Sequence, residues 1–242
     1  MELKTLLITQ ARTNSTRLRG KILKQINGKT LLQIHLDRLK KCCAVTDILV
    51  ATTLNSEDEI IFKNSKKWGL HSFRGSEDDV LDRFYKAAKS FEPDWVVRVT
   101  SDCPLLDPAL VDEVINFAHN SNVDYVSNVL IEHFPDGQDI EVFTFSTLEK
   151  AWKESNKNSE REHVTPYIIN NANTNGHKLF KAKNYPCENN YSDIRMTVDE
   201  PQDFELIEKL INDLGDDKTW TEYTNYIIEN NLTSINKEII RN

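Results

Sequence analysis

The sequence predicts an α/β fold with a mainly parallel sheet and helices on both faces. Before about residue 120, short apolar runs alternate with amphipathic stretches four times, an order typical of parallel β-α units. These runs end in hydroxyl, carboxylate or cationic residues, at the position where ligands bind in open α/β sheets. The chain has 242 residues, enough for a large hydrophobic core, and we expect one domain over residues 1–242.

The first half of the chain is predicted to form four strand–helix units. Apolar, β-branched and aromatic residues mark the strands, at residues 4–8, 47–53, 71–74 and 94–100. Apolar residues at helical spacing follow each strand. Three of the helices have a capping or helix-starting residue at their amino end: Thr30, Ser56 and Asp107. The dipeptide Asn27-Gly28 predicts a tight turn before the first helix.

After about residue 120 the regular order ends. We expect further strands at residues 124–130, 140–145 and 194–198. Helices are predicted to start at Ser146, Pro201, Thr219 and Ser234. The segment at about residues 132–190 is polar and rich in asparagine, and we expect it to leave the main sheet as an arm with a strand at 177–183.

Composition excludes several classes of protein. Charged residues make up 28% and hydrophobic residues 39%, as in globular proteins, and no apolar stretch approaches the ~20 residues of a membrane span. Without a signal-peptide pattern, we expect a cytoplasmic protein with no membrane partner. The net charge of −8 and the lack of a basic face argue against nucleic acid as a partner. The four cysteines lack metal-site spacing, so we expect reduced thiols.

The loop after the first strand carries the strongest functional signal. It contains four cations, with hydroxyl and amide donors between them: Arg12, Arg17, Arg19 and Lys21. Cations and donors at the carboxyl end of a first strand favour an anion such as a triphosphate. The competing interpretation is an ordinary solvated surface loop.

Two carboxylates follow predicted strands directly. Asp102 comes after the strand at 94–100, and Asp199 comes after the strand at 194–198. If these strands are parallel neighbours, their ends meet at one edge of the sheet. Mg²⁺ takes one or two carboxylates together with substrate phosphates and water, so the pair predicts a magnesium site. The competing interpretation is that both residues are helix N-caps.

Six blocks, in order along the chain, form a recognisable pattern: residues 8–21, 74–83, 98–105, 135–143, 160–167 and 195–201. Together they resemble the cytidylyltransferases that activate acidic sugars as CMP derivatives. That group includes the CMP-Kdo and CMP-sialate synthetases, and the chain is most similar to the branch known as spore coat polysaccharide biosynthesis cytidylyltransferase-like. The chain departs from many relatives at Arg19, where they have proline, and at Asn14, where they have glycine.

The resemblance implies a Rossmann-like nucleotidyltransferase fold, a three-layer α/β/α arrangement with a small arm. It implies transfer of CMP from CTP to a sugar acid or related sugar hydroxyl, with release of pyrophosphate, in surface polysaccharide or glycoconjugate biosynthesis. It further implies Mg²⁺ as cofactor and a homodimer. The acceptor itself is left open, because its contacts are expected in the polar segment at about residues 132–190.

The resemblance also assigns roles to single residues. Arg12, Arg17 and Lys21 would hold the triphosphate, and the implied catalytic residues are Arg12, Lys21, Asp102 and Asp199. The implied metal ligands are Asp102 and Asp199. The residues implied to bind the nucleotide are Ala11, Arg12, Thr13, Asn14, Ser15, Arg17, Lys21, Thr52, Thr53, Arg74, Ser76 and Asp102. Those implied to bind the acceptor are Asp136, Gln138, Glu141, Arg161 and His163.

Other functions remain open at this point. The acceptor could be an alditol phosphate, or the donor another nucleoside triphosphate. A GT-A-like glycosyltransferase would also use acidic residues after a strand, but the cationic loop suits a triphosphate better than a nucleotide sugar. A catalytically silent regulator would bind CTP without releasing pyrophosphate. An NAD dehydrogenase is disfavoured, because no G-x-G-x-x-G follows the first strand. Asp78 and Asp79 fit either a ribose contact or a favourable helix start.

Overall fold

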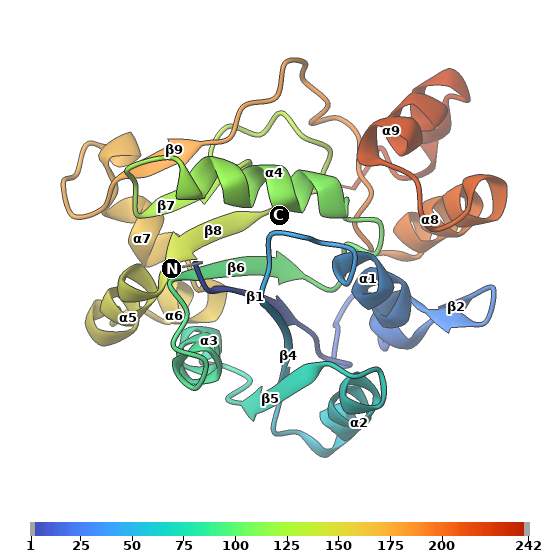
Figure 1. Cartoon of the computed structure of the whole chain (residues 1–242). Helices are drawn as coiled ribbons and strands as arrows, with labels where there is room; N and C mark the ends of the chain where they lie inside the picture. Colours follow the sequence, from blue (N-terminus) through green and yellow to red (C-terminus); the bar gives the residue numbers. More distant parts are fainter. Residues whose placement is uncertain (1–2, 240–242) are drawn as a thin grey trace.

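A computed structural model of the chain describes residues 3–239, and its central feature is a mixed β-sheet covered by helices (Figure 1). Within the described residues the sheet has seven strands in the order β5-β4-β1-β6-β8-β7-β9. Their bounds are Thr5–Gln10 for β1, Asp47–Thr53 for β4, His71–Gly75 for β5, Trp95–Thr100 for β6, Tyr125–Ser127 for β7, Glu141–Thr144 for β8 and Ala182–Asn184 for β9. A separate hairpin pairs β2 (Gln25–Ile26) with β3 (Lys29–Thr30) around the predicted Asn27-Gly28 turn.

The helices begin close to the predicted caps. Thr30 accepts a hydrogen bond from Gln33 N, and Asp107 accepts one from Ala109 N with proline in the first turn. The α-helices are α1 Leu31–Leu39, α2 Glu59–Lys67, α3 Val80–Lys89, α4 Pro108–His119, α5 Phe145–Glu154, α6 Asn158–His163, α7 Pro166–Asn170, α8 Pro201–Leu214 and α9 Trp220–Glu229. Short 3₁₀ helices are η1 Lys21–Leu23, η2 Ser56–Asp58, η3 Asn173–Asn175 and η4 Leu232–Ile235, the last in place of the helix predicted from Ser234.

The predicted fold class is confirmed. Strands β5, β4, β1 and β6 are parallel, and alternate residues of β1 are buried on opposite faces of the sheet. Leu7 packs in one core with side chains of α1 and α4, while Leu6 and Ile8 pack in another with α3 and α5. The β-α order of the first half therefore produces the layered arrangement that the alternation predicts (Figure 1).

Three strand predictions in the second half are wrong in extent or kind. The strand expected at 124–130 is limited to β7, and the one expected at 177–183 is limited to β9, the edge strand that pairs with β7. The polar segment thus returns to the main sheet instead of only leaving it. The segment expected as a strand at 194–198 forms one isolated bridge, between Asp136 and Arg195.

The reason for the last error is the position of β8. This strand runs antiparallel between β6 and β7, so the place beside β6 is taken. The segment 194–198 still alternates as the sequence indicates, because Ile194, Met196 and Val198 are buried together with residues of α8 and α9. Its apolar periodicity therefore reports burial against helices and not a place in the ladder.

Gly137 allows two chain segments to approach closely. Its φ is +105°, and a Cβ built there would lie 2.7 Å from the carbonyl carbon of Met196. The two segments are joined by a hydrogen bond from the N–H of Met196 to the carbonyl of Asp136 at 2.6 Å. We expect Gly137→Ala to lower the free energy of unfolding by about 2–4 kcal/mol, measured by urea unfolding.

Gly176 is the matched control for this substitution. Its φ is +78°, but a Cβ there would meet nothing within 4 Å, so Gly176→Ala carries the backbone strain without the collision. We expect it to cost about 1 kcal/mol. Equal losses at the two positions would contradict the close approach at Gly137.

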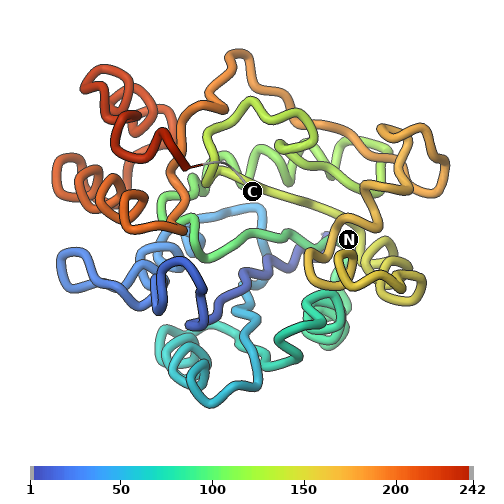
Figure 2. Tube along the Cα trace, turned by 180° about the vertical axis from the view of Figure 1, so that it is seen from behind, coloured from blue at the N-terminus to red at the C-terminus, as the bar shows by residue number. Residues whose placement is uncertain are grey.

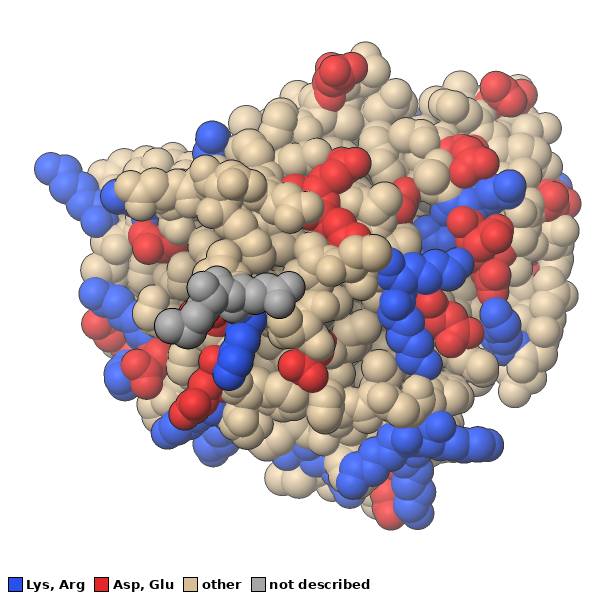
Figure 3. Space-filling model, in the orientation of Figure 1, with Lys and Arg blue, Asp and Glu red and all other residues tan. Residues whose placement is uncertain are grey.

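Among the described residues, no helix is both long enough and apolar enough to cross a membrane. The face shown in Figure 3 carries both basic and acidic side chains, and basic side chains are grouped in its lower right part.

Candidate active site

The loop after β1 is fastened so that it turns back on itself. The N–H and the hydroxyl of Thr13 each donate to Asp58 Oδ1 at 2.7 Å, and the N–H of Gly20 donates to the Thr13 carbonyl at 3.0 Å. The 3₁₀ helix η1 then begins at Lys21, whose side chain extends inward and leaves the residue only 8% exposed. The loop thus delivers a buried ammonium group to the carboxyl edge of the sheet.

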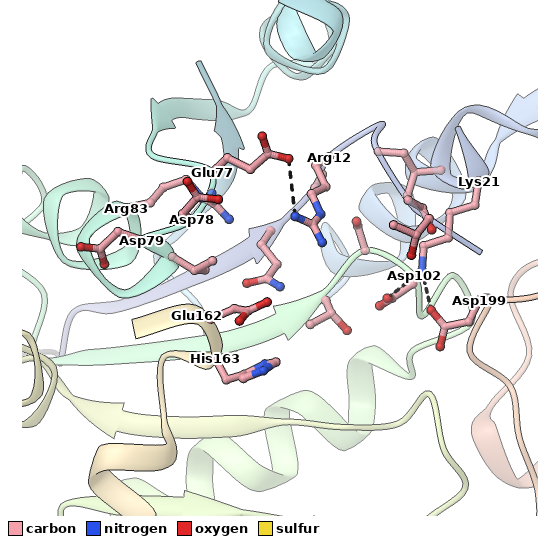
Figure 4. A pocket seen from close by; sticks show the side chains of 18 of the residues that line it. Arg12, Lys21, Glu77, Asp78, Asp79, Arg83, Asp102, Glu162, His163 and Asp199 are labelled. Atoms are coloured by element: carbon pink, nitrogen blue, oxygen red, sulfur yellow. Dashed lines mark hydrogen bonds and ion pairs between the residues drawn. The ribbon is translucent and has the colours of Figure 1, made fainter. Parts of the chain in front are cut away.

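Lys21 lies between two carboxylates. Its Nζ donates to Asp102 Oδ2 at 3.0 Å and to Asp199 Oδ1 at 2.8 Å (Figure 4). The three segments that carry these residues are far apart in sequence, yet Figure 2 shows the N-terminal loop, the turn after β6 and the segment before α8 meeting beside the sheet. The structure therefore brings together the two predicted metal ligands and one of the predicted phosphate-binding residues.

The charges in this cluster reinforce one another. Burial alone would lower the pKa of Lys21, but attraction by Asp102 and Asp199 outweighs it and raises that pKa above 10.5. Burial would likewise raise the pKa of Asp102, but the Lys21 ammonium lowers it to about 2. Near neutral pH, Asp102 is therefore ionised and Lys21 is protonated.

His35 forms a hydrogen bond to the turn that carries Asp102. The Nδ1 of His35 lies 2.8 Å from the carbonyl oxygen of Cys103, and its Nε2 lies 3.0 Å from the hydroxyl of Thr9. Because a carbonyl can only accept, Nδ1 carries the proton and Nε2 accepts from Thr9. Burial lowers the pKa of His35 to about 4, so this support is a neutral imidazole at pH 7.

Asp199 lies close to Asp102 because of a backbone contact that the sequence did not indicate. The N–H of Val198 donates to the carbonyl of Asp102 at 2.8 Å, which joins the two segments directly. The proximity was predicted, but the predicted cause, two parallel neighbouring strands, is wrong because the segment before Asp199 lies outside the ladder.

A cavity of about 770 Å³ opens over this cluster. Its lining includes nine of the predicted site residues: Ala11, Arg12, Ser15, Arg17, Lys21, Asp102, Arg161, His163 and Asp199. Arg17 also pairs with Asp199, with Nη2 at 3.1 Å from Oδ2, so two of the loop's cations converge on the same carboxylate. One end of the cavity is therefore a dense arrangement of alternating charges.

The other end of the cavity is formed by α3 and α6. Arg12 pairs with Glu77 at 3.6 Å, and Arg161 of α6 pairs with Asp79 at 2.8 Å, which ties α6 to the start of α3. Asp79 also caps α3 through Asp82 N, so it has the structural role that the helix-start interpretation expected. The side chain of His163 projects towards the cavity from the end of α6 (Figure 4).

A strained turn fixes the end of α6. Val164 has φ +70° and ψ −56°, and the N–H of Thr165 donates to the carbonyl of His163 at 2.8 Å. These values define a classic γ-turn, which is rare and costly for a β-branched residue. Such strain is found where the surrounding structure holds a functional segment in place.

Several predicted nucleotide-binding residues lie outside the cavity. Thr13 and Thr53 both donate to the buried carboxylate of Asp58 and so anchor the loop. Arg74 donates to the carbonyls of Thr53, Leu54 and Asn55. The remaining residues of this group are also absent from the cavity lining: Asn14, Thr52 and Ser76. The geometry gives these side chains no part in the cavity surface.

Three predicted acceptor-binding residues also lie outside the cavity, in buried networks of their own. Gln138 is 0% exposed, receives Asp107 N–H and donates to the carbonyl of Leu105. Glu141 is paired with Arg98 and accepts from the Tyr125 hydroxyl. Asp136 is paired with Arg195. Their bonding partners come from distant parts of the chain, so the sequence alone could not reveal these roles.

The cavity also contains residues outside the predicted list of site residues. They are Gln10, Thr16, Ile22, Glu77, Asp78, Asp79, Val80, Arg83, Thr100, Ser101, Asn158 and Glu162. Four of them had a signal. Gln10 ends β1, Glu162 lies between the predicted residues Arg161 and His163, and Asp78 and Asp79 were weighed for a ribose contact. Gln10 Oε1 is a buried atom without a hydrogen-bond partner among the described residues.

The donor set around Lys21 suits a small hard cation. Asp102 Oδ2 and Asp199 Oδ1 already hold a cationic group between them, and both atoms are carboxylate oxygens. Within residues 3–239 no group of three or more His, Cys, Asp or Glu side chains is arranged as a complete metal cage.

The fold and the site together define a class of protein. A mainly parallel sheet with a cationic loop after its first strand and paired carboxylates opposite that loop is the arrangement of a nucleotidyltransferase. The chain belongs to the cytidylyltransferase family, whose model matches residues 6–239, and the resemblance seen in the sequence is thereby confirmed.

Similar proteins support the assignment. The spore coat polysaccharide biosynthesis protein SpsF of Bacillus subtilis is 32% identical over 218 residues, which is 87% of this chain and 88% of that protein. The 3-deoxy-manno-octulosonate cytidylyltransferase of Geotalea daltonii is 35% identical over 116 residues, 47% of this chain and 44% of the other. The solved structure of a cytidylyltransferase from Leptospira borgpetersenii is 32% identical, with a TM-score of 0.88 and 100% of both chains covered.

Proposed function

We propose that the protein is a Mg²⁺-dependent cytidylyltransferase that transfers CMP from CTP to a hydroxyl of a sugar or sugar acid and releases pyrophosphate. The observation that carries the proposal is the convergence of Arg17 and Lys21 on Asp102 and Asp199 in one cavity. The names of the relatives in surface polysaccharide and octulosonate metabolism favour a role in surface polysaccharide or glycoconjugate biosynthesis.

The charges of the cavity suit a triphosphate. Arg12, Arg17 and Lys21 all come from the loop and first turn after β1, where they can surround phosphate oxygens. The carboxylates opposite them would repel a bare triphosphate, so a cation is needed between the two. Mg²⁺ bound by Asp102 and Asp199 would neutralise charge on the phosphates and polarise the reacting phosphoryl group.

The reaction is an in-line displacement. The acceptor hydroxyl oxygen forms a bond to the α-phosphorus, the bond from that phosphorus to the bridging oxygen breaks, and pyrophosphate leaves with the electron pair. The hydroxyl proton passes to solvent or to a base. The chain's own residues position the reactants and stabilise the charge that develops on the phosphate, without a covalent intermediate on the protein.

The acceptor is placed by this proposal beside α6. His163 and Arg161 line the cavity there, opposite the loop that would hold the phosphates. Arg161 is already bonded to Asp79 and to two main-chain carbonyls, so His163 is the more available of the two for an acceptor group.

The test is pyrophosphate release from each of the four nucleoside triphosphates with a panel of sugar acids, neutral sugars and alditol phosphates. Mass spectrometry then identifies the product. We expect release from CTP at least about 100-fold faster than from UTP, ATP or GTP, since the differing base contacts act in the transition state. Faster release from another triphosphate would contradict the proposed donor. CTP binding without any release would favour a silent regulator.

A further inference from the structure

The guanidinium of Arg195 is enclosed by three carboxylates. The residue is 7% exposed, and its nitrogens contact Asp136, Asp199 and Asp203. None of the proposed roles in phosphate, metal or acceptor binding uses this side chain. Its position directly behind Asp199 suggests a different contribution to the site.

The two oxygens of the Asp199 carboxylate have different partners. Oδ2 receives Arg195 Nη2 at 2.8 Å and Arg17 Nη2 at 3.1 Å. Oδ1 receives Lys21 Nζ at 2.8 Å and thus faces Asp102 across the ammonium group. A carboxylate turns freely about its last bond unless its oxygens are held, so the contacts on Oδ2 determine where Oδ1 points.

Asp203 holds Arg195 in turn. Its Oδ1 accepts from Arg195 Nε at 2.9 Å and its Oδ2 accepts from Arg195 Nη2 at 3.1 Å, the bidentate geometry that suits a guanidinium. Oδ2 also receives the N–H groups of Asp199 and Glu200, each at 2.9 Å. Asp203 is 0% exposed, and Asn236 Nδ2 donates to its Oδ1 at 2.9 Å. The orientation of Asp199 is therefore fixed through both its side chain and its backbone.

We propose that Arg195 is a positioning residue, which, held by Asp203, aims Asp199 Oδ1 at the cation site shared with Asp102. Arg195 touches neither nucleotide nor acceptor in this proposal. It acts on the affinity of the site for a divalent cation. The proposal rests on the metal-binding role of Asp199 in the proposed function.

The test is Arg195→Lys, which keeps the positive charge but loses the planar fork. Binding of Mn²⁺ is measured directly by the electron paramagnetic resonance of the free ion, with and without CTP. Changes to groups that orient metal ligands typically cost ~10–100-fold in affinity, and we expect a loss of that size. The Mg²⁺ concentration for half-maximal pyrophosphate release should rise in parallel, while the KM for CTP at saturating Mg²⁺ changes less than about threefold.

Arg38→Lys is the matched control. Arg38 is also a buried arginine, 3% exposed, but it donates to the carbonyls of Leu106, Asp216 and Lys218 and contacts neither Asp102 nor Asp199. It should lose thermal stability while its Mn²⁺ affinity stays that of the unsubstituted protein. If Arg195→Lys does not fold, Asp203→Asn is the second variant. It keeps the shape of the side chain but weakens its hydrogen bonds to Arg195, and it should also lower the affinity for Mn²⁺.

The outcomes separate the two proposals. A folded Arg195→Lys protein with Mn²⁺ affinity within twofold of the unsubstituted protein overturns the positioning role. Absence of Mn²⁺ binding by the unsubstituted protein, with and without CTP, overturns it as well. Weaker Mn²⁺ binding by Arg195→Lys supports the positioning role. If at the same time the unsubstituted protein releases pyrophosphate from no triphosphate, the proposed reaction is refuted while the positioning role stands.

Discussion

Replacing Asp102 by asparagine is expected to lower the rate of CTP-dependent pyrophosphate release by about 10³-fold or more. The substitution keeps the size of the side chain but removes its charge, which the carboxyl of Asp102 carries near neutral pH because the Lys21 ammonium lowers its pKa to about 2. Asp199 alone would then face the cation, and Lys21 would lose one of its two partners. The same substitution at Asp199 should have an effect of similar size.

The measurement is the steady-state rate over a range of Mg²⁺ concentrations, with folding checked by circular dichroism. Asp47→Asn serves as the control, because Asp47 is a half-exposed carboxylate that begins β4, at the end of the strand away from the site, and pairs with His71. It should retain the full rate. Normal activity in both Asp102→Asn and Asp199→Asn would rule out the metal-binding assignment.

Replacing Lys21 by methionine is expected to lower kcat/KM for CTP by about 100-fold or more, because the side chain can no longer contact a phosphate. In the absence of ligands it should also lower the free energy of unfolding, because two carboxylates then face each other without an ammonium between them. The loss should be smaller than the ~3–5 kcal/mol of a fully buried pair. The reason is that the Asp102 side chain is 29% exposed.

The diagnostic result is the response of the melting temperature to Mg²⁺ without nucleotide. In the unsubstituted protein the ion has to compete with the ammonium group, so we expect Mg²⁺ to raise the melting temperature more in Lys21→Met. Lys24→Met is the control, since Lys24 lies over the ring of Phe204, 4.8 Å from its centre, and touches neither carboxylate. A smaller or equal response of Lys21→Met would show that Lys21 does not occupy the cation position.

The elements that depend on local pattern were predictable. The strand at 47–53 and the helix start at Thr30 agree with the structure, because apolar periodicity and capping act over a few residues. The insertion of β8 between β6 and β7 was not predictable, since strand order depends on contacts between distant segments. The same limit explains why 194–198 reads as a strand but packs against α8 instead.

The candidate site divides in the same way. The cations after β1 and the two carboxylates were recognisable because each follows an apolar run, and the structure gathers Lys21, Asp102 and Asp199. Gln138 and Glu141 were assigned to the acceptor, yet their polar atoms bond to partners 16 to 43 positions away in sequence. No spacing rule reports such partners. For the same reason, only Arg161 and His163 were predicted among the residues of α6 that line the cavity, while Asn158 and Glu162 were not.

The start of α8 and the orientation of Asp199 depend on one side chain. Asp203 completes the capping box of α8 with Glu200 and also holds Arg195 behind Asp199. Binding at the site and opening of this helix end are therefore thermodynamically linked, and the coupling is reciprocal. A ligand that immobilises Asp199 raises the free energy needed to open the start of α8. By the same amount of free energy, a substitution that destabilises this helix start weakens the binding of the ligand. If Asp199 binds the cation as proposed, the C-terminal region would contribute to affinity without contacting the substrate.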